Sequence, residues 1–486
     1  PFPASWLALR LAEKDASTMK SVEENLGISI ASDPALALAM EKTDRLLRER
    51  GITQTGLSDL VAARLVEKAL ELCDGAVSPD DEAFIKRDRK IDAVLTHKVL
   101  GYPVMVALLA LTLWLTISGA NYPSELLGRG LFWLGGRLES LFSEWGVPAL
   151  IVDALFNGVW RTLAWVVSVM LPPMAIFFPL FTLLEDLGYL PRVAFNLDGF
   201  FKKCSACGKQ ALTMCMGFGC NAAGVTGCRI INSPRERLLA ILTNNFVPCN
   251  GRFPTLIALI AVFFAGAGFS LAPAVMLTGV MLLGVLMTML TSKLLSATIL
   301  RGVPSSFTLE LPPYRKPRVL QIILRSIMDR TLFVLGRAVT VAAPAGLVIW
   351  ILGNTAFGGA SLLSIMSDAL DPVGRFFGMD GVILLAFILG LPANEIVIPI
   401  ILMCYMSEST LMDYASLEEL GSILVQNGWT TTTALCVILF SLMHWPCSTT
   451  LITIKKETGS LAYTGLAALL PTVFGLFFCF LAARLF

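Results

Sequence analysis

Hydrophobic and polar positions divide the chain into two regions that meet near residue 98. Before this point, apolar residues recur at helical spacing between charged ones, as over residues 55–72, which predicts short amphipathic helices in a small cytoplasmic segment. After it, uncharged runs are long enough to cross ~30 Å of hydrocarbon, which takes about 20 residues. These runs cover residues 99–124, 162–184, 253–292, 338–367 and 458–483.

Two further apolar spans each carry one ionisable residue, Glu395 within residues 381–406 and His444 within residues 420–454. The run 253–292 is interrupted by Gly-Ala-Gly and Pro273, so it predicts two helices. Residues 128–145 alternate at helical spacing and suit a helix that lies in the membrane interface. The predicted fold is an all-α polytopic membrane protein with about eight to ten transmembrane or re-entrant helices.

Composition supports this assignment, because 55% of residues are hydrophobic, 15% are charged and the mean hydropathy is +0.73, which excludes a water-soluble protein. The net charge of +1 gives no indication of a nucleic-acid partner. Residues 301–337 hold seven Lys and Arg against two acids, which predicts a cytoplasmic loop. The chain opens on Pro1 without a signal-peptide pattern, so we expect a fragment of a longer protein whose eleven cysteines are reduced.

Within the membrane region, one pair of motifs occurs twice. One copy has GFGCN at residues 217–221 and Pro-Cys at 248–249, and the other has GLPANE at 390–395 and Pro-Cys at 446–447. Each copy is a Gly-x-x-x-Asn element in an apolar segment, followed by Pro-Cys in a later one. The separations, 27 and 52 residues after the asparagine, differ, so the motifs alone do not prove an internal repeat.

The residues in these motifs suit a metal ion inside the bilayer. Gly and Pro interrupt helices, and hydrocarbon tolerates the exposed backbone groups only at a cavity or in buried protein; transporters built from repeats place such breaks at ion sites. Thiolate, amide oxygen and carboxylate are metal ligands, and thiolate favours transition metals. The sequence predicts a translocation site that contains Cys220, Asn221, Cys249, Asn394, Glu395 and Cys447, with His444 as a ligand or a supporting group.

A structural interpretation of the same residues stays open. A buried cysteine is often a small hydrophobe, and Gly-x-x-x-Asn also suits close helix packing. An intramembrane carboxylate such as Glu395 is functional by default, but Glu395 also suits a structural ion pair with a buried Arg252 or Arg337.

Two other groups of residues have weaker signals. Glu185 and Asp186 suit a vestibule that collects cations, or a helix end paired with Arg192. Cys204-x-x-Cys207, with Cys215, suits half of a metal site or a redox pair, although one CxxC without a second is unspecific. No Walker-type phosphate loop occurs, so we do not expect this chain to be an enzyme.

These blocks resemble the FeoB family of ferrous iron transporters. LEDLGYL at 184–190, followed by Arg192, resembles the LEDxGYLxRxAFxxD block of that family, and GFGCN at 217–221 resembles its GFGCN motif. PANE at 392–395 is similar to its PAKE element, with Asn394 in place of the usual Lys, and Pro-Cys at 446–447 is similar to its PC motif. Residues 222–224 are AAG where the family pattern has VPA. The likeness covers essentially the whole chain.

The resemblance implies a Fe²⁺ substrate, two gate repeats in the bacterial cytoplasmic membrane, and an N-terminal GTPase domain outside this chain that uses GTP and Mg²⁺ to energise or gate transport. It also implies FeoA- or FeoC-type cytoplasmic partners, a homo-oligomer in the lipid bilayer, and the cysteines Cys220, Cys249 and Cys447 on the ion path. The implied segments are a cytoplasmic helical segment (1–95), the first membrane and interfacial helices (96–160), the first gate repeat (161–255), core helices with a basic loop (256–330), the second gate repeat (331–456) and the last helix (457–486).

Alternative functions are a carrier of Mn²⁺ or Zn²⁺, a membrane thiol oxidoreductase that uses Cys204 and Cys207, and a solute carrier of the nucleoside type. The last alternative predicts polar and aromatic residues at the positions of Cys220 and Cys249. Substitution of Cys220 and of Cys204 separates a metal-ion transporter from a thiol oxidoreductase, because only the oxidoreductase requires Cys204.

Overall fold

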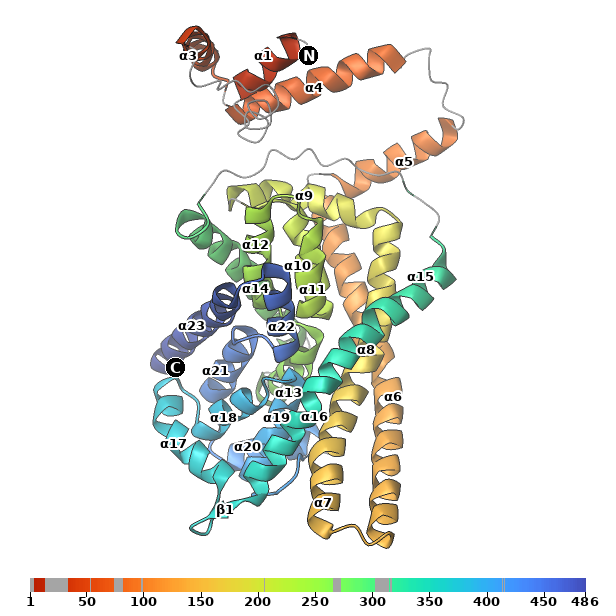
Figure 1. The fold of residues 1–486 in the computed structure, drawn as a ribbon, viewed down its shortest axis with the longest axis vertical. Helices are drawn as coiled ribbons and strands as arrows, with labels where there is room; N and C mark the ends of the chain where they lie inside the picture. Colours follow the sequence, from red (N-terminus) through yellow and green to blue (C-terminus); the bar gives the residue numbers. More distant parts are fainter. Residues whose placement is uncertain are drawn as a thin grey trace. The chain divides into compact units, whose positions relative to one another are not determined.

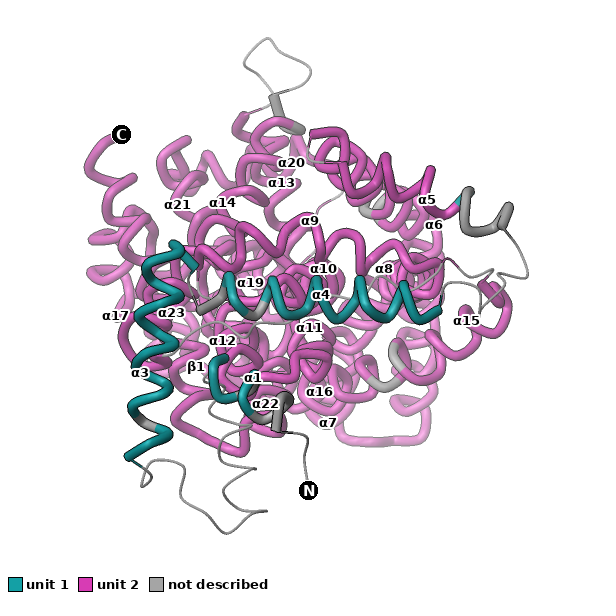
Figure 2. Tube along the Cα trace, turned by 90° about the horizontal axis from the view of Figure 1, so that it is seen from above, with its two compact units in different colours: residues 1–87, 306–308 teal, residues 88–305, 309–486 magenta. Residues whose placement is uncertain are grey.

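A computed structural model of the chain describes residues 4–13, 34–52, 54–73, 82–97, 99–204, 206–264, 272–301, 314, 317–412, 414 and 416–486. Its contacts divide the chain into two compact units (Figure 2). The first unit comprises residues 1–87 with 306–308, and the second comprises residues 88–305 with 309–486.

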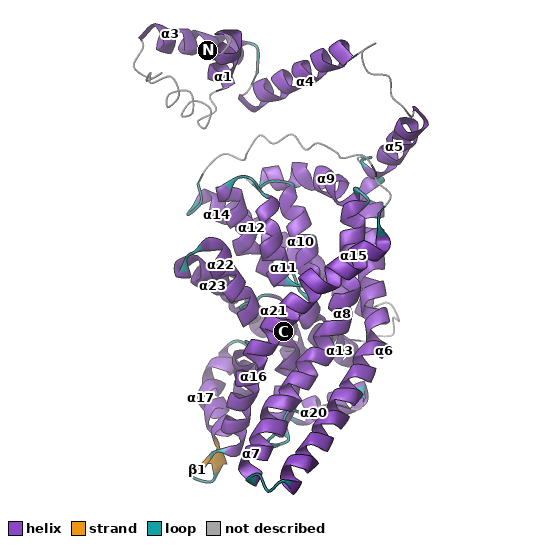
Figure 3. Cartoon of the chain, turned by 45° about the vertical axis from the view of Figure 1, so that its right-hand side comes forward, coloured by secondary structure: helices purple, strands orange, loops and turns teal. Residues whose placement is uncertain are grey.

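Helices make up almost all of the described part of the chain (Figure 3). The strands among the described residues are β1 (Ala356–Phe357) and β2 (Ala360–Ser361), which form one short antiparallel hairpin. The predicted all-α class is confirmed.

In the described part of the first unit, three helices lie wholly within it, α1 (Ala4–Glu13), α3 (Pro34–Glu49) and α4 (Gln54–Cys73). Helix α4 covers the amphipathic stretch predicted over residues 55–72. Its exposed face carries the ion pair between Arg64 and Glu67, which adds little stability because water screens it.

The second unit is a polytopic membrane domain, as predicted. Two pairs of helices, α17 (Leu362–Phe376) with α18 (Gly381–Leu389) and α20 (Leu417–Gln426) with α21 (Thr431–Leu442), bend by 110° at a short break. Counting each bent pair as one span gives up to eight spans among the described residues. The six unbent runs that are long and apolar enough to cross a membrane are Gly101–Glu144, Ala149–Asp186, Pro234–Phe264, Val275–Ala297, Val319–Asn354 and Leu461–Leu485.

A long hairpin of helices forms one side of this unit (Figure 1). Helix α6 (Gly101–Glu144) runs antiparallel to α7 (Ala149–Asp153), the π-helix η2 (Ala154–Trp160) and α8 (Arg161–Asp186). Residues 128–145 therefore do not form the separate interfacial helix that we expected, because they continue α6 without a break. Their helical spacing predicts a helix correctly, but it does not determine where that helix begins.

Helix α16 (Leu332–Asn354), preceded by α15 (Val319–Ser326) and the π-helix η6 (Ile327–Thr331), packs against α8 and η2. The approach is close, because a Cβ atom on Gly346 would lie 2.6 Å from the carbonyl oxygen of Gly158. The uncharged run 338–367 is not one helix. Helix α16 ends at Asn354, and Gly358 and Gly359, at φ of 65° and 92°, turn the chain through the β-hairpin.

Shorter helices fill the interior of the second unit. The run 253–292 forms two helices as predicted, although the Gly-Ala-Gly interruption lies outside the described residues. The interior and remaining elements are α9 (Tyr189–Lys203), α10 (Lys209–Gly219), α11 (Asn221–Gly227), η3 (Cys228–Ile230), α12 (Pro234–Thr243), η4 (Asn244–Phe246), η5 (Asn250–Arg252), α13 (Phe253–Phe264), α14 (Ala272–Ala297), η7 (Asn394–Ile396), α19 (Val397–Tyr405), α22 (Ser448–Thr458) and α23 (Leu461–Leu485).

A buried ion pair joins α5 (Glu82–Leu95) to α9. Arg192 is only 2% exposed, and its Nε donates to Asp92 Oδ1 at 3.0 Å, while the Tyr314 hydroxyl donates to the same oxygen at 2.7 Å. Burial alone would raise the pKa of Asp92, but the hydrogen bonds from Arg192 and Tyr314 and the Arg192 charge outweigh burial and lower it. The ion pair of Arg192 is thus with Asp92, which the sequence did not indicate as its partner.

Candidate metal-ion site

Four interruptions of helices meet in the interior of the second unit. Cys220 separates α10 from α11, Cys249 precedes η5 and α13, Ala393 precedes η7 and α19, and Cys447 precedes α22. Cys220 and Ala393 have extended φ and ψ, and Cys249 and Cys447 also leave the helical region, with ψ of 169° and 156°, so no regular helix continues through these four residues. The Gly and Pro residues that predicted the breaks therefore lie where the breaks occur.

The two Gly-x-x-x-Asn elements have nearly the same backbone conformation. Cys220 has φ −157° and ψ 124°, and Ala393, which occupies the corresponding position in the second copy, has φ −154° and ψ 122°. An asparagine follows each of them, Asn221 and Asn394. The two copies of the sequence motif thus have the same local backbone conformation at the helix break.

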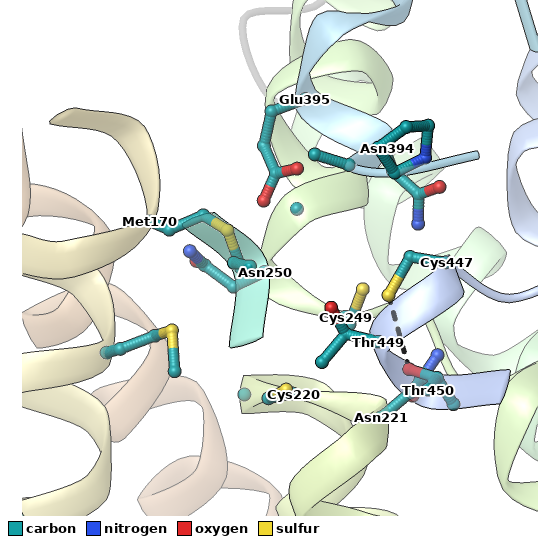
Figure 4. Close-up of a pocket in the computed structure, with 16 residues that line it drawn as sticks. Met170, Cys220, Asn221, Cys249, Asn250, Asn394, Glu395, Cys447, Thr449 and Thr450 are labelled. Carbon is teal, nitrogen blue, oxygen red and sulfur yellow. Dashed lines mark hydrogen bonds between the residues drawn. The ribbon is translucent and has the colours of Figure 1, made fainter. Parts of the chain in front are cut away.

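A small cavity lies between these four breaks (Figure 4). Its volume of about 30 Å³ is large enough for at least one water-sized species. The side chains with metal-ligand chemistry that line the cavity are Met170, Met174, Cys220, Asn221, Cys249, Asn250, Asn394, Glu395, Cys447, Thr449 and Thr450.

The structure therefore brings six of the seven predicted metal-site residues to one cavity. The seventh, His444, does not line it. Figure 4 shows the labelled thiols converging from different segments, and the Cys447 thiol lies 3.3 Å from the Thr450 hydroxyl oxygen. Among the described residues, no three His, Cys, Asp or Glu side chains are close enough to hold a metal together. An ion held here would thus need amide, thioether or backbone ligands as well, or a small inward movement of the walls.

Glu395 is a buried carboxylate at the first residues of η7, with 6% of its surface exposed. Its carboxylate packs on the backbone of Gly251, since a Cβ atom there would lie 2.7 Å from the Glu395 carboxyl carbon. No salt bridge joins Glu395 to a basic residue in the described part of the chain. The alternative that Glu395 is paired with Arg252 or Arg337 thus finds no support among these contacts.

Arg252 makes a different set of contacts. Its side chain, 1% exposed, donates to four backbone carbonyls and so joins the break at Cys249 to the break at Cys447. The acceptors are the carbonyl oxygens of Asn245 at 3.1 Å, Leu442 at 2.7 Å, His444 at 3.2 Å and Trp445 at 3.4 Å. A guanidinium carries five N–H donors in a fixed plane, which suits such a set. Exposed carbonyls at the breaks thereby gain a donor.

His444 contacts the side chain of Asn394 but does not line the cavity. Its Nε2 is 3.2 Å from the Asn394 side chain, and its Nδ1 is 2.9 Å from the carbonyl oxygen of Ser441. The ring is 1% exposed and packs against Phe387, with ring centroids 4.9 Å apart.

The other predicted groups lie elsewhere. Glu185 and Asp186 are exposed at the end of α8 and do not line the cavity. Cys204 and Cys207 lie around the start of α10, and Cys215 lies within it; none of the three lines the cavity, and all are free thiols.

Sequence reasoning missed the two methionines in the cavity wall. Met170 and Met174 are one helical turn apart on α8, beside Pro172 and Pro173. Met-x-x-x-Met next to a proline pair in a membrane helix is the signal that was available, but Met also fills apolar gaps in ordinary cores. Asn250 also lines the cavity and was missed, although it directly follows the first Pro-Cys motif in the sequence.

The fold and the cavity define a polytopic α-helical membrane protein in which broken helices surround a buried site lined by sulfur, amide oxygen and one carboxylate. Two family models match the chain, one described as nucleoside recognition (Gate), over residues 167–264 and 335–461, and one described as ferrous iron transport protein B C terminus, over residues 277–329. The chain is similar to the FeoB family, whose curated members match most of its length.

Curated relatives agree with this assignment. The Fe(2+) transporter FeoB of Staphylococcus aureus (strain MSSA476) is 29% identical over 83% of this chain and 59% of the relative. The protein of the same name from Methanocaldococcus jannaschii is 26% identical over 93% of this chain and 66% of the relative. A fusion of Fe(2+) transport protein A with FeoB from Porphyromonas gingivalis is 24% identical over 94% and 58%. The chain spans about three fifths of the length of these relatives, and no solved structure matches it.

Proposed function

We propose that this chain forms the membrane pathway along which Fe²⁺ passes into the cytoplasm, and that the cavity at the four helix breaks is its principal binding point. The observation that carries the proposal is Glu395, a buried carboxylate without a basic partner among the described salt bridges, beside three thiols. An uncompensated charge inside a membrane costs several kcal/mol, and a passing cation removes that cost.

The proposed ligands combine soft and hard donors. Cys220, Cys249 and Cys447 provide sulfur, and Asn221, Asn394 and Glu395 provide oxygen, a mixture that suits a borderline divalent transition metal better than Na⁺ or Ca²⁺. Affinity alone does not separate Fe²⁺ from Zn²⁺ or Mn²⁺, so we expect these ions to compete. The exposed acids Glu185 and Asp186 precede α9, which pairs with α5 of the cytoplasmic segment, so they would form a cation-binding vestibule at the cytoplasmic end of the pathway.

We expect protein domains outside this chain to control the opening and closing of the pathway. A GTPase domain that binds GTP and Mg²⁺ would shift the populations of closed and open states through the helices of residues 1–95. The fused relative from Porphyromonas gingivalis supports an FeoA-type partner for this protein. Assembly as a homo-oligomer in the bacterial cytoplasmic membrane completes the proposal.

Uptake of radiolabelled Fe²⁺ by cells that depend on the intact protein tests the proposal. Cys220→Ser should reduce uptake by about 10-fold or more, in the range seen when metal-site groups are removed. Cys215→Ser is the matched control, because Cys215 lies in α10, the helix that ends just before Cys220, but does not line the cavity. Normal uptake with Cys220→Ser would refute the binding point, and loss of activity with Cys204→Ser alone would favour the thiol oxidoreductase.

A further inference from the structure

The imidazole of His444 has a hydrogen-bonding pattern that determines its tautomer. Nδ1 faces two backbone carbonyls, of Phe440 at 3.1 Å and Ser441 at 2.9 Å. Carbonyl oxygens only accept hydrogen bonds, so Nδ1 must carry a hydrogen and donate it. In the neutral ring, Nε2 is then an acceptor.

The surroundings favour the neutral ring. The guanidinium of Arg252 donates to the carbonyl oxygen of His444 at 3.2 Å, and both side chains are 1% exposed. A second positive charge beside this buried guanidinium would lack a counter-ion among the described contacts and would be costly. Nε2 therefore needs a donor, but the atom placed 3.2 Å away is Oδ1 of Asn394, which only accepts, so the amide must be turned by 180° to bring Nδ2 to this position.

This requirement orients Asn394. An amide has one end that donates and one that accepts, and the two are assigned from their partners. If Nδ2 of Asn394 donates to His444, Oδ1 takes the other position. Figure 4 draws the amide above Cys447 with its nitrogen toward that thiol and the cavity, and the 180° turn that satisfies His444 exchanges this nitrogen for Oδ1. The atom directed at the cavity is thus the oxygen.

Asn221, the corresponding residue of the first motif copy, is oriented by the same logic. When its amide oxygen and nitrogen are exchanged, Nδ2 donates to the carbonyl oxygens of Gly217 at 3.2 Å and Val247 at 3.3 Å, so this orientation is the one that its partners favour. Oδ1 is then turned away from these carbonyls, and Asn221 also lines the cavity.

We propose that His444 is a positioning residue, which accepts a hydrogen bond from Asn394 and so turns the Asn394 oxygen toward the transported ion. The inference rests on the proposed function, because it assumes that the cavity holds a metal. His444 does not touch the ion. It excludes the alternative amide orientation, in which an NH₂ group would face the cation and repel it.

The substitution Asn394→Asp separates orientation of the amide from the other roles that His444 could have. Both ends of a carboxylate are oxygen, so a carboxylate at position 394 does not need His444 to orient it. The test measures Co²⁺ binding to the intact protein in lipid nanodiscs, by the absorption of the Co²⁺–thiolate bond. His444→Phe should weaken binding about 10-fold or more in the presence of Asn394, the range for groups that orient a ligand. In the background of Asn394→Asp, the same substitution should change the affinity less than about 2-fold. Phe keeps the ring packing against Phe387.

Each other outcome has a definite meaning. If the unsubstituted protein binds no Co²⁺, the proposed binding point fails and the positioning role fails with it. If His444→Phe weakens binding equally in both backgrounds, His444 is a ligand or a general packing residue, and the positioning role is refuted while the site stands.

A second measurement needs no substitution at position 444 and so does not depend on the fold of a variant. The chain has two histidines, His97 and His444, so the ¹⁵N spectrum of histidine-labelled protein has two sets of ring signals, which His97→Gln assigns. We expect hydrogen on Nδ1 of His444 and none on Nε2. A protonated Nε2 would overturn the proposal.

Discussion

Gly251→Ala probes the position of the Glu395 carboxylate without removing any polar group. The added Cβ would lie 2.7 Å from the carboxyl carbon of Glu395, whereas ordinary contact begins at 3.4 Å. Oε1 of Glu395 would lie nearer still, so the carboxylate must retreat by more than the ~0.7 Å that its carbon alone requires, which is several times the ~0.2 Å within which metal–ligand distances hold. Gly251 has no positive φ, so alanine is compatible with its backbone.

We expect this substitution to weaken metal binding 10- to 100-fold, about 1.4–2.7 kcal/mol, with little loss of stability. Stability should change by less than about 1 kcal/mol, because the displaced group is the end of a flexible side chain. Co²⁺ titration of the protein in nanodiscs measures the first quantity, and thermal unfolding measures the second.

Two further variants complete the experiment. Gly336→Ala on α16 is the matched control, since a Cβ there meets nothing within 4 Å. Glu395→Asp shortens the side chain by one bond of about 1.5 Å, so it makes room for Ala at 251. The loss in the double variant should be smaller than the sum of the two single losses. Unchanged Co²⁺ affinity in a folded Gly251→Ala protein would refute the view that the carboxylate binds the ion from this position.

Two other predictions concern the scaffold. Arg252→Lys should destabilise the protein by about 3 kcal/mol or more in denaturant unfolding, because a single ammonium cannot reach all four carbonyls and those left unpaired are buried; unchanged stability would show that the contacts are incidental. Asp92 has a lowered pKa, so its pair with Arg192 should stabilise the fold fully above about pH 3.9, the unfolded value, and lose that contribution as pH falls through the folded value. Asp92→Asn should therefore reduce stability near neutral pH and match the unsubstituted protein in acid, and an equal deficit at all pH values would contradict the pair.

The breaks in the helices could be predicted because their cause is local. Gly and Pro around Cys220 and Asn394 disfavour a continuous helix whatever surrounds them, so the motifs placed the interruptions correctly. That the breaks meet at one cavity depends on long-range packing, which the thiols and the carboxylate only suggested through their chemistry.

The errors have equally physical causes. Apolar spacing over residues 128–145 is the same for a helix in the interface and for the end of a 44-residue helix, so periodicity could not separate them. The partners of Arg252 could not be foreseen, because every residue carries a carbonyl and the sequence does not show which ones a break exposes. Met170 was missed because, in an apolar helix, the sequence does not distinguish a methionine that lines a cavity from one that only packs in the core.

The guanidinium of Arg252 has a mechanical consequence. Its hydrogen bonds join the chain next to Cys249 to the carbonyls just before Cys447, so we expect these two segments to move together. An alternating-access motion that leaves this joint intact keeps the two thiols at a fixed separation. The wall that carries Met170 and Met174 is not held by Arg252, so we expect α8 to move relative to the two thiols when an ion enters or leaves the cavity.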